Sequence, residues 1–158
     1  MERPSAIEPQ GLFDGLRWSA ILGGAVLDNV LTFLASIPII LLVAGGEAFS
    51  RDEEAARRAI DQAVVAPEFL FWSFIVGISI TVYAALWACR RAGVFHLRHG
   101  GWTAVASAVL ASLLLLPPGA TAGPAPPLWY TGLALALMVP AGVFGGWLAS
   151  RVGRPAAR

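Results

Sequence analysis

The chain has 158 residues, of which 57% are hydrophobic and only 13% charged. A soluble globular domain is about 45–50% apolar and about 25% charged, so this composition favours a protein embedded in lipid. The formal net charge of +1 argues against a nucleic-acid partner. A single cysteine, Cys89, rules out an internal disulfide and a metal site made of cysteines alone. We expect no bound metal and no cofactor.

Four apolar segments are each long enough, or nearly so, to cross a membrane as a helix. They cover residues 18–44, 69–89, 99–116 and 128–150. A hydrocarbon core of ~30 Å needs about 20 helical residues, so the third segment is the shortest candidate and a re-entrant course is its alternative. The length of the first segment disfavours a cleaved signal peptide. Barrel strands would alternate polar and apolar residues, and these segments do not. We therefore predict an all-α bundle of four transmembrane helices.

The arginines are divided unevenly between the two sides of this predicted topology. All eleven basic residues are arginine, which is typical of GC-rich bacterial genomes. The side with the two tails, residues 1–17 and 151–158, carries Arg3, Arg17, Arg90, Arg91, Arg98, Arg151, Arg154 and Arg158. On the other side, the loop after the first span has three arginines and five acids. The positive-inside rule then places both termini in the cytoplasm, with the chain in a bacterial plasma (inner) membrane.

The loop after the first span has the pattern of a short amphipathic helix over residues 51–65. Ser50 followed by Glu53 indicates a capping box at its start. This helix would lie with its apolar stripe on the outer surface of the membrane or on the bundle itself. Packing on its own chain is the simpler interpretation.

Asp28 is the residue most suggestive of function. It lies ten residues past Trp18, about 15 Å along a helix and so near the bilayer centre. A charge there costs at least ~2.5–3.5 kcal/mol, so such a residue faces the bundle interior or water, and we expect its carboxyl to be protonated. Residues of small or polar type recur every fourth position along this face, with Asn29 at its edge: Gly24, Asp28, Thr32 and Ser36.

Polar groups at similar depth on the other spans are the predicted partners of Asp28. They are Ser79 or Thr81, Ser107, and the carbonyl of Ala136 that Pro140 would free, since proline removes one helical hydrogen bond. Two interpretations stay open. A neutral carboxyl would tie helices together, each interhelical bond contributing ~0.6 kcal/mol on average. Alternatively, the same groups would form a proton or ion site. The packing interpretation is narrowly preferred.

Small residues spaced by four predict close helix packing. The predicted contact points are Gly24, Gly77, Gly142 and Gly146, the last two in a row with Ser150. Such rows let helix backbones approach closely, either within one chain or between copies.

The loop between the second and third spans holds both histidines, His96 and His99, among Arg90, Arg91 and Arg98. A closed metal site needs more ligands than two imidazoles, so we expect a solvated loop at the inner surface. Its three arginines would attract anionic lipid headgroups, at about 1 kcal/mol for each basic residue.

The residues 87–93 (WACRRAG), followed by His96 and Gly100-Gly101, and the residues 145–151 (GGWLASR) give a family resemblance over about half the chain. The pattern resembles small four-helix bacterial integral membrane proteins of unknown function. The departure is at Gly77, where one glycine stands rather than a pair. The resemblance implies an integral membrane protein and brings no substrate, cofactor or catalytic residue.

Three classes of function follow, in order of preference. The first is an accessory or structural subunit of a larger membrane assembly, with the lipid bilayer and other membrane proteins as partners. The second is a homo-oligomeric channel or transporter that passes protons or ions at Asp28. An intramembrane enzyme comes last, because no serine–histidine, paired-aspartate or HExxH arrangement falls within the spans.

Overall fold

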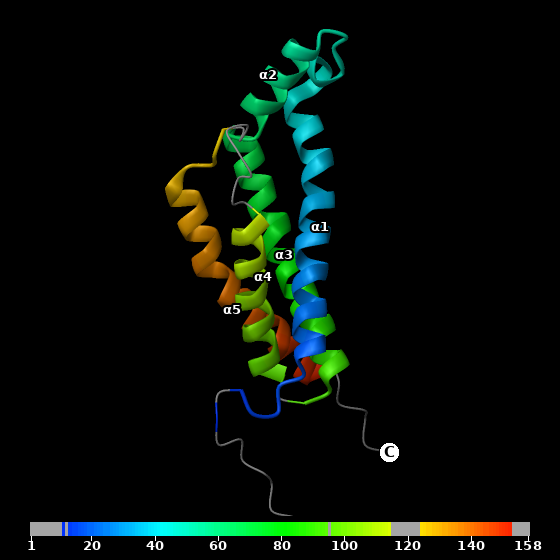
Figure 1. Cartoon of the computed structure of the whole chain (residues 1–158), viewed down its shortest axis with the longest axis vertical. Helices are drawn as coiled ribbons and strands as arrows, with labels where there is room; N and C mark the ends of the chain where they lie inside the picture. The colour runs from blue at the N-terminus through cyan, green and yellow to red at the C-terminus, as the bar shows by residue number, and fades with distance from the viewer. Residues whose placement is uncertain (1–10, 12, 95, 115–123, 153–158) are drawn as a thin grey trace, which may run out of the picture.

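The structure, a computed structural model, describes residues 11, 13–94, 96–114 and 124–152. These residues are helical throughout their regular parts and form no strand. The elements in chain order are α1 (Trp18–Ala44), η1 (Gly45–Phe49), α2 (Glu53–Ala63), α3 (Pro67–Ala92), α4 (His96–Leu114) and α5 (Leu128–Val152). Helices α1, α3, α4 and α5 form one bundle, and α2 lies across one end of it (Figure 1).

Three helical segments in the described residues are long and apolar enough to cross a membrane, which indicates a membrane protein. They are Trp18–Phe49, in which η1 continues α1, Pro67–Ala92 and Leu128–Val152. The bounds expected for the first span, residues 18–44, coincide with α1. Helix α3 extends the second expected span by two residues at its start and by three at its end. Helix α5 begins where the fourth expected span begins and ends two residues later.

Helix α4 differs most from its expected span. It begins at His96, three residues before the expected start, and the last two residues of the expected span lie outside the described residues. Its first six residues include two histidines, an arginine and two glycines. These residues lower the mean hydropathy of α4, which is therefore not among the three segments that are long and apolar enough to cross a membrane.

The capping box expected at Ser50 and Glu53 does not form at the start of α2. Asp52, not Ser50, is the N-cap, and its Oδ1 accepts a hydrogen bond from the Glu54 N–H at 3.0 Å. The Ser50 hydroxyl instead accepts from the Asp52 N–H at 3.2 Å. Asp52 has the extended backbone that an N-cap requires, so the helix starts two residues later than expected. Ala59 and Ala63 are its buried residues.

Burial is concentrated in one half of the bundle, the half that contains the start of α1. There the ends of α3 and α5 pack against the starts of α1 and α4. The buried residues run from Ala20 to Asp28 on α1, from Thr81 to Ala92 on α3, from His99 to Ser107 on α4 and from Ala141 to Ala149 on α5. Outside these stretches, the bundle helices bury only Leu70. We call this half the sealed half and the other the open half.

Glycines create the close approach of helices in the sealed half. A Cβ on Gly142 would lie 2.5 Å from the carbonyl oxygen of Gly100, and a Cβ on Gly24 would lie 2.7 Å from Cγ2 of Thr103. Gly146 similarly leaves no room for a side chain beneath the His96 carbonyl. Gly77 differs from the expected packing role, because a Cβ there would meet no atom within 4 Å.

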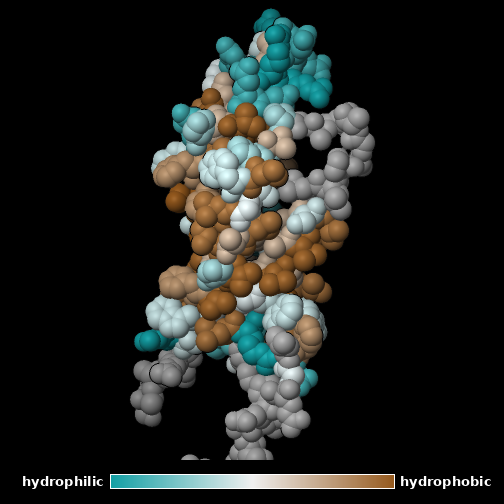
Figure 2. Space-filling model, turned by 90° about the vertical axis from the view of Figure 1, so that its left-hand side faces the viewer, coloured by the Kyte–Doolittle hydropathy of each residue, from teal (hydrophilic) through white to brown (hydrophobic). Residues whose placement is uncertain are grey.

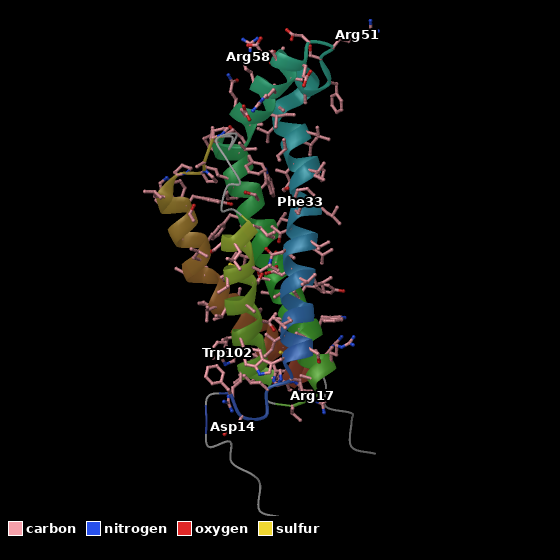
Figure 3. The ribbon with its side chains drawn as sticks, in the orientation of Figure 1. Asp14, Arg17, Phe33, Arg51, Arg58 and Trp102 are labelled. Carbon is pink, nitrogen blue, oxygen red and sulfur yellow. The ribbon has the colours of Figure 1, made fainter. Side chains whose placement is uncertain are left out.

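The surface separates into an apolar middle and polar ends. Figure 2 shows hydrophobic side chains over the middle of the molecule and hydrophilic ones gathered at the α2 end. In Figure 3, Phe33 projects from α1 in the apolar middle, Arg51 and Arg58 lie at the α2 end, and Arg17 lies at the opposite end. Phe33 is 67% exposed. This distribution is typical of a helix bundle surrounded by lipid.

Candidate functional site: a buried carboxyl beneath a cavity

Asp28 is held by hydroxyls from two other helices. It sits on α1 and is only 3% exposed. The Thr81 hydroxyl of α3 lies 3.1 and 3.2 Å from its two carboxyl oxygens. The Ser107 hydroxyl of α4 also hydrogen-bonds to the Asp28 carboxyl. The carboxyl therefore joins α1, α3 and α4 at one point.

Asn29 extends this network by one residue. Its side-chain amide donates to the Ser107 hydroxyl at 2.9 Å and to the Ser107 carbonyl at 3.3 Å. It also donates to the Ala25 carbonyl of its own helix at 2.9 Å. Asn29 thus fixes the position of Ser107, which in turn contacts Asp28.

The network accommodates the carboxyl with or without its proton. When Asp28 is ionised, the Thr81 and Ser107 hydroxyls both donate to it. When Asp28 is protonated, its proton can be donated to the Thr81 oxygen, because the Thr81 hydroxyl has a second acceptor in the Gly77 carbonyl, 3.1 Å away. The change requires only rotation of one hydroxyl, since a hydroxyl both donates and accepts.

A cavity of about 170 Å³ opens above Asp28, towards the open half. Its floor is polar and its walls are mostly apolar. At its far end the Ser73 and Tyr130 hydroxyls are hydrogen-bonded to each other at 2.8 Å. The lining residues are Asp28, Asn29, Thr32, Ser73, Phe74, Gly77, Ile78, Thr81, Ser107, Ala111, Tyr130, Ala134 and Met138. None of these is basic, so the cavity carries no side chain that would neutralise a charged Asp28.

The predicted polar face of α1 is only partly within this site. Thr32 is exposed and lines the cavity. Ser36 lies beyond it and donates to the Phe33 carbonyl of its own helix at 2.7 Å. Asp28, Asn29, Thr81 and Ser107 are therefore the predicted residues that the structure joins by hydrogen bonds.

Helix α5 contributes differently from expectation. Ala136 and Pro140 are exposed and do not line the cavity, so the carbonyl freed by Pro140 is not part of its wall. Tyr130 supplies the polar group of α5 instead. On α3, Ser79 is exposed and donates to the Ile75 carbonyl at 2.8 Å, which leaves Thr81 as the partner of Asp28.

The expectation of a solvated loop around the histidines is wrong. Both belong to α4, and His99 is completely buried, with its Nε2 accepting from the Arg17 N–H at 2.9 Å. The Cys89 thiol donates to the His96 carbonyl at 3.0 Å. The cause is Gly93, which ends α3 in the left-handed region at φ 72° and lets α4 begin three residues later.

The arginines proposed for lipid contact divide into two groups. Arg90 and Arg91 are exposed, and the Arg91 guanidinium lies 5.4 Å from the centre of the Trp87 ring. Arg98 instead donates to the backbone carbonyls of Gly11 and Asp14. Its head group is therefore engaged by the segment that precedes α1, and Asp14 lies at that end of the molecule in Figure 3.

Comparison with protein-family models, with characterised proteins and with solved structures finds no match to the chain. The described residues contain no group of three or more histidine, cysteine or acidic residues that could hold a metal ion.

Proposed function

We propose that the chain is a four-span integral membrane protein of a bacterial plasma membrane, with both termini in the cytoplasm. Two observations support α4 as the fourth span. It packs against α1, α3 and α5 within the apolar part of the bundle. In addition, its start shares one end of the bundle with the start of α1 and the end of α5 (Figure 1), where Arg17, Arg91 and Arg98 also lie. The amphipathic α2 then lies at the outer surface.

The chain's role is that of a non-catalytic accessory or structural subunit of a membrane assembly. The observation that carries this proposal is the sealed half. Ile21, Ala84, Ala88 and Ala104, from three helices, have exposed fractions of 0%. A conduit through one copy would have to cross this layer, where the packing leaves no space for water or ions. A single copy would therefore act through its outer surface, by contact with neighbouring membrane proteins.

Native mass in mild detergent, with identification of co-purifying proteins, tests the proposal. An accessory subunit should be recovered with a foreign membrane protein in fixed stoichiometry. Gly142→Leu should lose that partner by opening the sealed half. Gly132→Leu is the matched control for folding and should keep the sealed half closed, since a Cβ on Gly132 meets no atom within 4 Å. Recovery of a homo-oligomer without a foreign partner would contradict the accessory role.

A homo-oligomeric channel or transporter is the second candidate, and the cavity above Asp28 favours it. Intramembrane carboxyls often mark proton or ion pathways, and this one lines an open cavity. Because each copy is closed in its sealed half, the pathway would leave the cavity above Asp28 and continue between copies. Proton and ion flux into proteoliposomes tests this candidate. Loss of flux in Asp28→Asn, with assembly intact, would support transport, and the absence of flux from the wild-type protein would reject it.

A further inference from the structure

The cavity above Asp28 has the features of a binding site for a compact organic cation. Its floor is rich in hydrogen-bond acceptors. Asn29 uses its amide N–H groups on Ser107 and Ala25, so what it can still offer is its carbonyl oxygen. The Asp28 carboxyl is likewise an acceptor when ionised. When Asp28 is ionised, an occupant of this floor must therefore bring donors.

Charge narrows the choice of occupant further. Asp28 is the only carboxylic acid among the lining residues, and none of them is basic. An anionic ligand would meet a carboxyl without any compensating charge. A cationic ligand would pair with Asp28 away from water, where charge-assisted hydrogen bonds are about twice as strong as neutral ones.

The cavity walls favour an apolar body for the part of the ligand away from Asp28. Apolar side chains from three helices face the cavity, and two aromatic rings, Phe74 and Tyr130, are among them. Aromatic faces attract cations as well as apolar groups. A cavity of about 150 Å³ holds a molecule the size of benzene, and this cavity measures about 170 Å³. We propose that the cavity binds a protonated primary amine with a benzene-sized apolar body, its ammonium at Asp28 and its body between Phe74 and Met138.

This inference extends beyond an accessory role, since ligand binding and assembly with a partner are separate properties. Gly77 offers a direct way to block the site. It lies midway between Ser73 and Thr81 on the α3 face that lines the cavity, and a Cβ there would meet no atom within 4 Å. Gly77→Leu should fill the cavity without displacing a helix.

Equilibrium dialysis with the full chain in lipid nanodiscs tests the proposal, with empty nanodiscs as the correction for lipid partitioning. The probes are benzylammonium, benzyl alcohol and benzoate at neutral pH. Benzylammonium should bind the wild-type protein at least roughly tenfold more tightly than benzyl alcohol, and benzoate should not bind, because only the first supplies a charged donor. Equal binding of the amine and the alcohol, or no binding of the amine, would overturn the proposal.

Variants locate the site. Gly77→Leu and Asp28→Asn should each weaken benzylammonium binding by roughly tenfold or more, whereas Gly132→Leu, the same change on an exposed face, should leave it unchanged. Thermal unfolding of each variant shows that the bundle is intact. If Asp28→Asn unfolds, Gly77→Leu alone decides, since it keeps the carboxyl network. Undiminished binding in folded Gly77→Leu would overturn the proposal.

Discussion

Gly100 on α4 and Gly142 on α5 face each other so closely that a Cβ on Gly142 would lie 2.5 Å from the Gly100 carbonyl oxygen and 2.6 Å from the Ala104 Cβ. Neither helix can keep this approach with a side chain in between. Without a hydrophobic driving force between helices in lipid, such close backbone packing is a main source of their association. The α4–α5 interface is therefore highly sensitive to side-chain volume.

We expect Gly142→Leu to destabilise the folded bundle by about 1–3 kcal/mol or more, because overpacking at a backbone contact forces the helices apart. Thermal unfolding in detergent measures the effect. Gly132→Leu, on the same helix in open space, should change the stability by less than about 0.5 kcal/mol. Equal effects of the two substitutions would contradict the α4–α5 packing described above.

Asp28→Asn should have a mild effect on stability, about 0.6 kcal/mol, because an amide oxygen still accepts from the Thr81 and Ser107 hydroxyls. Asp28→Leu should cost more, about 1–3 kcal/mol, since it leaves the buried Ser107 hydroxyl without its acceptor, whereas the Thr81 hydroxyl can still donate to the Gly77 carbonyl. Unfolding of the two variants under the same conditions gives the comparison. Equal destabilisation by the amide and the leucine would contradict the role of the Asp28 oxygens as hydrogen-bond acceptors for Thr81 and Ser107.

His99→Ala should destabilise the sealed half of the bundle by about 1–3 kcal/mol, because His99 is fully buried and accepts from the Arg17 N–H. Hydrogen exchange at the Arg17 amide should rise in parallel. The exposed neighbour Arg90 provides the control, and Arg90→Ala should stay within about 0.5 kcal/mol of the wild-type stability. No change in His99→Ala would remove the structural role assigned to this residue.

The helices and the position of Asp28 could be predicted because they depend on local sequence. Apolar run length marks α1 over its full extent, and a lone carboxyl within such a run must face inward. The partners Thr81 and Ser107 could be proposed from depth alone, since equal distances from the membrane surface place residues at one level.

The remaining features depend on how helix faces meet, which one sequence does not reveal. Gly77 looks like Gly142 in its spacing, yet it lines a cavity because no helix packs against it. The sequence predicts an inner loop or the edge of a span for Gly100 and His99. The left-handed Gly93 shortens the connection and carries both into the packed interior.

The topology of four crossings is tested most directly by labelling single cysteines on intact cells with a membrane-impermeant maleimide. In a Cys89→Ala background, the variants are Arg58→Cys on α2, Ala125→Cys before α5 and Arg91→Cys at the end of α3, all at exposed positions. Four crossings with cytoplasmic termini predict labelling of Arg58→Cys and Ala125→Cys on intact cells, and of Arg91→Cys only after permeabilisation. Protection of Ala125→Cys together with Arg91→Cys, while Arg58→Cys is labelled, would show that α4 does not cross and would contradict the four-span bundle.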